Sequence, residues 1–151
     1  MPTVFFLNGP NANLYGLDSK GLYGTESFPA IRERCLATAE RLGLELEFRQ
    51  TNHEGILIDW IQEARDAADG VLINAAGLSY TSIAVMDALL AFEGPVIEVH
   101  MSNIHKREPF RHRTYTSLAA TGSISGLGPL GYELAIAAMA ELIADGREGG
   151  A

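Results

Sequence analysis

Cysteine and long apolar runs are scarce in this chain of 151 residues, and each scarcity excludes a class of protein. The single cysteine, Cys35, allows neither an intrachain disulfide nor a metal site of several cysteines. Its place in an apolar helical pattern predicts a buried thiol. No apolar run approaches the ~20 residues that a membrane span needs. The run at 4–7 lacks a preceding basic segment, so we expect no signal peptide and a cytoplasmic protein.

Positive charge is also scarce, because 11 Lys and Arg stand against 19 Asp and Glu, for a formal net charge of -8. Binding to nucleic acid or to an anionic membrane surface relies on clustered basic residues, so we expect neither partner. A few of the basic residues nevertheless gather in the segment 105–113, namely Lys106, Arg107, Arg111 and Arg113. This segment is locally positive in an acidic chain, and the composition alone does not explain why.

Short apolar runs alternate with longer helical patterns along the chain. We expect strands at 3–7, 44–50, 70–74, 95–99 and 123–125, and helices at 28–42, 55–67, 81–92 and 130–144. This alternation predicts an α/β fold, with a flavodoxin-like, doubly wound, five-stranded parallel sheet in a three-layer αβα arrangement. The length suits one domain, which we place at 1–144, followed by a flexible C-terminal tail at 145–151.

Polar residues gather after three of the predicted strands, at 8–13, 74–82 and 98–103, where sheets of this kind bind ligands. Glu98 and His100 are one residue apart on a strand and therefore share a face. A carboxylate beside an imidazole fixes its tautomer and favours its protonated form, as a general acid requires. A purely structural pair explains the same spacing, so both interpretations stay open.

Asparagines and tyrosines in the predicted loops also have two interpretations. The asparagines of 8–13 either cap turns or orient a polar substrate or a water. Tyr15, Tyr23 and Tyr80 fall in polar loops, where a tyrosine is of catalytic interest only beside an arginine that stabilises its phenolate.

Common cofactor and metal patterns are not favoured. The segment 126–131 matches G-x-G-x-x-G, but a dinucleotide site also needs a following strand with an acidic residue, and only one helix remains. We therefore expect a tight strand-to-helix turn there. No two histidines have metal-ligand spacing with a supporting carboxylate, so we expect no metal.

Taken together, the motifs resemble the type II 3-dehydroquinate dehydratase (type II dehydroquinase) family from residue 4 to about 142. The matching segments are 7–11 (Leu-Asn-Gly-Pro-Asn), 22–24 (Leu-Tyr-Gly), 50–55 (Gln-Thr-Asn-His-Glu-Gly), 98–100 (Glu-Val-His) and 107–112 (Arg-Glu-Pro-Phe-Arg-His). The resemblance implies a flavodoxin-like catalytic domain and trimers assembled into dodecamers. It also implies a lyase of the shikimate or quinate pathway without cofactor or metal. Such a lyase converts 3-dehydroquinate to 3-dehydroshikimate by anti elimination through an enolate.

The resemblance also implies roles for five catalytic residues. Tyr23 matches the base that removes the proton next to the ketone, and Arg107 matches the arginine that favours its phenolate. Asn11 matches the residue that helps to hold a water over the developing enolate oxygen. His100 matches the general acid that protonates the leaving hydroxyl, with Glu98 as the residue that orients it.

Substrate-binding roles follow in the same way. Asn74 and Arg111 match ligands of the ring hydroxyls, and the backbone N–H groups of Met101 and Ser102 match a carboxylate site. Asp87 resembles the acidic residue that reaches the active site of a neighbouring subunit.

Several positions depart from the family pattern. Asp18 stands where the mobile lid carries an arginine, for which the nearby Lys20 is an imperfect substitute. Tyr80 replaces a substrate-binding histidine, Ala75 a proline, and Met86 a commonly basic residue. These departures leave an alternative open: a divergent family member with reduced or redirected activity on a related cyclic hydroxy acid, or a catalytically silent binding scaffold.

Overall fold

Five parallel strands pair in the order β2-β1-β3-β4-β5. The computed structural model describes residues 1–17 and 23–149 and places the strands at β1 (Thr3–Asn8), β2 (Glu45–Gln50), β3 (Gly70–Asn74), β4 (Val96–His100) and β5 (Gly122–Ser125). The three middle strands are almost entirely buried, whereas the edge strands β2 and β5 are partly exposed. This topology confirms the predicted doubly wound parallel sheet.

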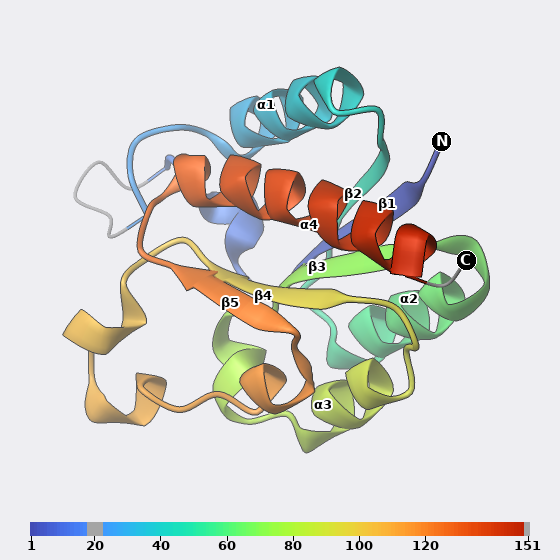
Figure 1. The fold of residues 1–151 in the computed structure, drawn as a ribbon. Helices are drawn as coiled ribbons and strands as arrows, with labels where there is room; N and C mark the ends of the chain where they lie inside the picture. Colours follow the sequence, from blue (N-terminus) through green and yellow to red (C-terminus); the bar gives the residue numbers. More distant parts are fainter. Residues whose placement is uncertain (18–22, 150–151) are drawn as a thin grey trace.

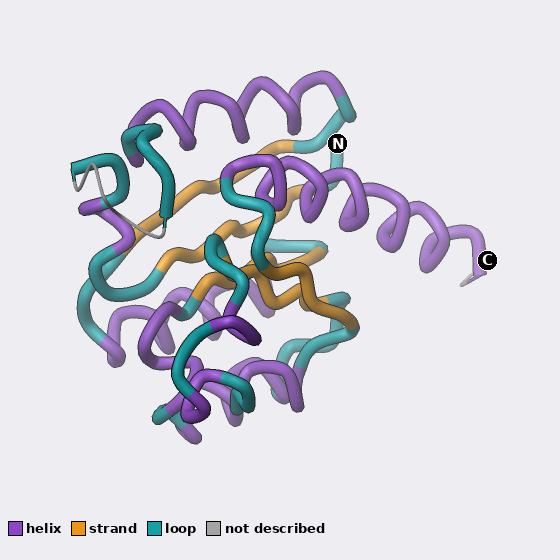
Figure 2. The backbone as a smooth tube through the Cα atoms, turned by 90° about the vertical axis from the view of Figure 1, so that its left-hand side faces the viewer, coloured by secondary structure: helices purple, strands orange, loops and turns teal. Residues whose placement is uncertain are grey.

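Helices cover both faces of the sheet (Figures 1 and 2). Successive strand residues point to opposite faces, so Phe6 packs against α1 (Phe28–Arg41) and α4 (Pro129–Gly149). Phe5 packs on the other face, against α2 (Glu54–Ala67) and α3 (Ile83–Leu90). Two apolar cores result, one on each side of the sheet, as the predicted three-layer arrangement requires. None of the helices described here is long and apolar enough to cross a membrane.

The ends of α1 are set by local sequence signals. The Ser27 hydroxyl accepts a hydrogen bond from the Ala30 N–H at 3.2 Å and caps the first turn. At the other end Gly43 has a φ of 75°, and the N–H of Leu44 donates to the Ala39 carbonyl at 2.9 Å. These are the features of a Schellman turn, for which glycine is the preferred residue. Cys35 lies buried within this helix, as predicted.

Three local predictions need correction. The helix predicted at 81–92 is shorter, because the Ser82 side chain caps it and α3 begins at Ile83. The helix predicted to end at residue 144 continues to Gly149, into the predicted tail; the boundary at 145 stays a prediction. The polar segment after β4, for which no element was predicted, forms the short 3₁₀ helices η3 (Ile104–Lys106), η4 (Pro109–Arg111) and η5 (Thr116–Ala119).

The loops after β1 and β3 touch each other at the carboxyl edge of the sheet. The Gly9 N–H donates to the Asn74 carbonyl at 2.8 Å. A Cβ atom on Gly9 would lie 2.5 Å from the Ala75 carbonyl oxygen, so no other residue allows this approach. The loop after β4 begins at the same edge, because β4 is parallel to β3 and ends on the same side of the sheet. This edge therefore brings together the three polar segments that the sequence predicted to meet.

Candidate active site

A cavity of about 150 Å³ opens at this edge of the sheet. Its walls come from the loops after β1, β3 and β4, and consist of Pro10, Asn11, Tyr15, Tyr23, Asn74, Ala76, Gly77, Tyr80, His100, Met101, Ser102, Arg107 and Arg111. Most of the predicted site residues therefore lie at one cavity, Glu98 and Asp87 being the exceptions. Arg107 and Arg111, from the predicted basic segment, make this wall positively charged in a chain of net charge -8.

Tyr23 is paired with Arg107 in this cavity. The Arg107 Nη1 donates to the Tyr23 hydroxyl at 3.0 Å and to the Ser102 hydroxyl at 3.1 Å. The guanidinium carbon also lies 5.6 Å from the centroid of the Tyr23 ring. A cation that donates to a phenol oxygen is placed to stabilise negative charge on that oxygen during a proton transfer. The geometry thus meets the condition under which a loop tyrosine becomes a candidate base.

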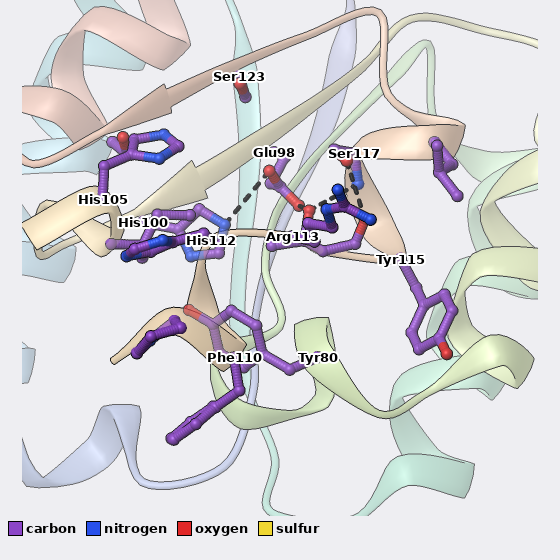
Figure 3. Close-up of a pocket in the computed structure, with 15 residues that line it drawn as sticks. Tyr80, Glu98, His100, His105, Phe110, His112, Arg113, Tyr115, Ser117 and Ser123 are labelled. Carbon is purple, nitrogen blue, oxygen red and sulfur yellow. Dashed lines mark hydrogen bonds and ion pairs between the residues drawn. The ribbon is translucent and has the colours of Figure 1, made fainter. Parts of the chain in front are cut away.

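Glu98 and His100 form a buried pair at the end of β4. The Glu98 Oε1 lies 3.3 Å from the His100 Nε2, an ion-pair contact that lacks regular hydrogen-bond geometry (Figure 3). The Glu98 Oε2 accepts hydrogen bonds from the Thr114 hydroxyl, at 2.7 Å, and from the Thr116 hydroxyl. Burial alone would raise the pKa of the Glu98 carboxyl, but His100 and the two threonines outweigh it and lower this pKa.

Tyr80 packs beside His100 and below Arg111. The Tyr80 and His100 rings are stacked, with centroids 6.3 Å apart and an interplanar angle of 26°. The Arg111 guanidinium carbon lies 5.2 Å from the Tyr80 ring centroid, and Arg111 Nε donates to Glu108 Oε2 at 2.6 Å. Burial raises the pKa of the Tyr80 hydroxyl. The aromatic ring at this departure from the family pattern therefore supports the imidazole and contacts a cation.

Below the cavity, Asn74 joins two tyrosine hydroxyls. Its Nδ2 donates to the Tyr15 hydroxyl at 2.8 Å and to the Tyr132 hydroxyl at 2.6 Å. Its Oδ1 accepts from the Ala76 N–H at 3.2 Å. The sequence does not indicate a role for Tyr132, because this residue falls in the apolar pattern of α4. For Tyr15 the sequence predicts only a tyrosine in a polar loop.

Asn11 and the backbone after His100 complete the cavity. Asn11 adopts the left-handed conformation, with a φ of 71°, which asparagine tolerates better than most residues. Its N–H donates to Asn52 Oδ1 at 3.0 Å. The backbone N–H groups of Met101 and Ser102 donate no hydrogen bond within the described part of the chain, and both residues line the cavity. Two such donors can bind an oxygen of a carboxylate.

Asp87, Asp18 and Lys20 are not part of this geometry. Asp87 is exposed on α3 and does not line the cavity, so its action in a neighbouring subunit stays a prediction. Asp18 and Lys20 lie outside the described residues. Within residues 1–17 and 23–149, no group of three or more His, Cys, Asp or Glu could hold a metal ion.

A larger cavity of about 880 Å³ shares His100 and Tyr80 with the smaller one (Figure 3). Its walls come mainly from residues 104–125 and include the Glu98 carboxylate. His105 and His112 lie there with ring centroids 6.1 Å apart, and the His112 Nε2 is 3.0 Å from the Arg107 carbonyl oxygen. The hydrogen bond between Arg107 and Tyr23 lies at the smaller cavity, which is therefore the candidate active site.

Comparisons with known proteins agree with one another. A family model described as dehydroquinase class II matches residues 2–140. A 3-dehydroquinate dehydratase from Chelativorans sp. (strain BNC1) is 54% identical over 139 residues, which cover 91% of this chain and 96% of that relative. A 3-dehydroquinate dehydratase 2 from Pseudomonas putida is 51% identical over 142 residues, 94% of this chain and 95% of the relative. The crystal structure of type II dehydroquinase from Propionibacterium acnes superimposes with a TM-score of 0.89 and 41% identity, over 93% of this chain and 97% of that one. The chain belongs to the class II dehydroquinase family.

Proposed function

We propose that this protein is a 3-dehydroquinate dehydratase, a lyase that removes water from 3-dehydroquinate to give 3-dehydroshikimate. Relatives that carry this name are about 50% identical to the chain over nearly its whole length. The observation that carries the proposal is the hydrogen bond from Arg107 to Tyr23 in the same cavity as the buried His100. A base and an acid on one cavity are what an elimination of water requires.

In this proposal Tyr23 acts as the base. Its phenolate, hydrogen-bonded to Arg107, removes a proton from the carbon next to the ketone, and the electron pair of the broken C–H bond moves to the ketone oxygen. The resulting enolate is stabilised by donors placed around that oxygen, with Asn11 as the residue that orients a water there.

His100 acts as the general acid in the second half of the reaction. The enolate re-forms the ketone, a carbon–carbon double bond appears, and the bond to the leaving hydroxyl breaks. His100 gives that hydroxyl a proton, so it departs as water. Glu98 orients the imidazole before the transfer. Tyr23 then gives its proton to solvent and His100 takes one up from solvent, which resets the enzyme.

The remaining residues of the cavity bind the substrate. The carboxylate of 3-dehydroquinate is placed at the backbone N–H groups of Met101 and Ser102, near the Arg107 cation. Asn74 and Arg111 contact ring hydroxyls, and Tyr80 covers the substrate beside His100. No cofactor enters any of these steps.

The proposal extends to assembly and location. We place this protein in the shikimate or quinate pathway in the cytoplasm, as trimers assembled into a dodecamer in which Asp87 reaches a neighbouring site. Exposed apolar side chains flank Asp87 on α3, at Ile83 and Leu90, and support a subunit contact there. Sedimentation equilibrium measures the size directly; a monomer at micromolar concentration would contradict the assembly.

The activity is tested with purified protein and 3-dehydroquinate, by following the absorbance of the conjugated enone product. We expect turnover by the wild type and a loss of at least about a hundredfold in kcat for Tyr23→Phe and for His100→Ala. Absence of product at high enzyme concentration would contradict the proposed function and would favour a silent scaffold.

A further inference from the structure

The two oxygens of the Glu98 carboxylate have different partners. Oε1 faces the His100 imidazole, at 3.3 Å from Nε2. Oε2 accepts hydrogen bonds from the Thr114 hydroxyl, at 2.7 Å, and from the Thr116 hydroxyl. All four residues are buried, and a buried carboxylate needs donors in place of water. The pair of Glu98 and His100 is therefore part of a group of four side chains.

The direction of both hydroxyl hydrogen bonds follows from the acceptor. An ionised carboxylate can only accept, so each threonine donates its single hydroxyl hydrogen to Glu98. The Thr114 oxygen accepts from the Ser117 N–H at 3.1 Å, which leaves its own hydrogen for this bond. Burial opposes ionisation of Glu98, but His100 and the two threonines lower the pKa of its carboxyl. Two donors thus occupy Oε2, and Oε1 is left to face the imidazole.

Residues 114–117 form a turn that is fixed to the rest of the site. The Tyr115 N–H, between the two threonines, donates to the Ser79 carbonyl at 2.8 Å. Ser79 directly precedes Tyr80, whose ring stacks on that of His100. The segment that binds the carboxylate is therefore joined to the segment that supports the imidazole ring.

We propose that Thr114 and Thr116 are positioning residues for the proposed general acid. They hold Oε2 and so fix the plane of the Glu98 carboxylate, whose Oε1 then keeps the His100 imidazole at the substrate cavity. The inference rests on the proposed dehydratase function. Neither threonine lines that cavity, so both act through Glu98. A general acid that is held in place beforehand meets the leaving hydroxyl without reorganisation.

The test compares Thr116→Val, which keeps the branched shape without the hydroxyl, with Thr116→Ser, which keeps the hydroxyl. A Glu98 carboxylate with one donor fewer can turn or take up a proton, and either change loosens its contact with His100. We expect Thr116→Val to lower kcat for 3-dehydroquinate about tenfold with KM within about threefold, because the acid acts in the transition state. Thr116→Ser should keep kcat within about threefold of the wild type.

Thr38→Val is the matched control. Thr38 is also buried and donates to a carboxylate, Glu133 Oε1, at 2.9 Å, but neither residue lines either of the two cavities that His100 borders. Loss of this hydrogen bond should lower the unfolding midpoint in urea and leave kcat within about threefold. An equal loss of kcat in Thr38→Val and Thr116→Val would assign the loss to stability and overturn the inference.

A double-mutant cycle shows whether Thr116 acts through His100. In a His100→Ala background Thr116→Val should change kcat less than about twofold, since the group that it positions is gone. The same loss in both backgrounds would overturn the inference alone. An unchanged kcat in Thr116→Val, an equal loss in Thr116→Ser or a change confined to KM would overturn it as well. A wild type without activity would overturn the proposed function, and this inference with it.

Discussion

Arg107 contacts Tyr23 both at its hydroxyl, 3.0 Å from Nη1, and over its ring, 5.6 Å from the guanidinium carbon. The Ser102 hydroxyl shares the same Nη1, at 3.1 Å, and so ties the cation to the loop after β4. A residue of the loop before α1 thereby depends on one from the segment after β4, 84 positions later. This contact joins the basic segment of this acidic chain to the loop that carries Tyr23.

Arg107→Met tests that contact. The variant keeps an unbranched side chain but loses the cation, so we expect kcat for 3-dehydroquinate to fall by about a hundredfold or more, since the Tyr23 oxygen loses its hydrogen-bonded cation. Steady-state kinetics at neutral pH measure the loss. Arg113→Met is the matched control, because Arg113 is exposed in the same segment and does not line the smaller cavity. Equal losses in both variants would mean that net charge, and not contact with Tyr23, is responsible.

Stability in acid should depend on Glu98. The pKa of this buried carboxyl is lowered in the fold, so the unfolded state binds its proton first as the pH falls. The contribution of Glu98 is therefore fully present above its ordinary pKa of 4.5 and is lost as the pH falls through the lower folded value. We expect Glu98→Gln to cost about 1–3 kcal/mol at pH 7 and to lose less stability than the wild type below pH 4.5.

Urea unfolding at several pH values measures this difference. Glu63→Gln is the control, because Glu63 also has a lowered pKa, through its hydrogen bonds to Arg49, but lies at the surface. Solvent screens that pair, so its removal should change stability little. A Glu98→Gln variant with the same acid dependence as the wild type would refute the assignment to Glu98.

Tyr80 should act through its ring more than through its hydroxyl. Tyr80→Phe keeps the stack on His100 and the ring contact with Arg111, and loses only the contact of the hydroxyl with Arg111, so we expect kcat and KM within about threefold of the wild type. Tyr80→Leu keeps the bulk but loses the face to which the cation binds, worth about 0.5–2 kcal/mol. We expect it to raise KM and lower kcat together. If Tyr80→Phe is as impaired as Tyr80→Leu, the hydroxyl is the part that matters.

Alkaline unfolding should begin with the buried thiol. Burial raises the pKa of Cys35 from 9.0 to about 12, so the unfolded state ionises first as the pH rises. Stability is fully present below about pH 9 and falls between pH 9 and about 12. We expect Cys35→Ala to be less stable than the wild type at pH 7 but to lose less stability over that interval, as measured by urea unfolding. Parallel curves for the two proteins would contradict this origin.

The sheet and its helices were largely predictable because their signals are local. Strands buried on both faces of a parallel sheet are continuous apolar runs, and the run at 70–74 therefore predicts β3, which is buried throughout. Ser27 and Gly43 mark the ends of α1 through hydrogen bonds within a few residues. The 3₁₀ helices after β4 have local caps, such as the Asn103 side chain that accepts from the His105 N–H, but they are too short to show a helical apolar period. This segment is also held by a distant contact, the hydrogen bond from the Tyr115 N–H to the Ser79 carbonyl.

The residues of the candidate site that belong to family motifs could be predicted from the sequence, whereas the hydrogen-bond network beneath them could not. Glu98 and His100 could be paired from their spacing alone. The link between Arg107 and Tyr23 needed the resemblance, because nothing in the sequence brings residues so far apart together. The amide of Asn74 joins hydroxyls that are 59 and 58 positions away, and such a network has no sequence pattern. This is why the contact between Asn74 and Tyr15 could be found only in the structure.

The close approach of Gly9 to the Ala75 carbonyl has a consequence for any attempt to redesign this enzyme. Main-chain atoms of two loops are fixed against each other there, so side chains around the cavity can be exchanged without moving its floor. Position 9 itself tolerates no such exchange, because even one methyl group would push the β1 and β3 loops apart. A library aimed at new cyclic hydroxy acids should therefore vary positions 15, 80 and 111 and leave position 9 as glycine.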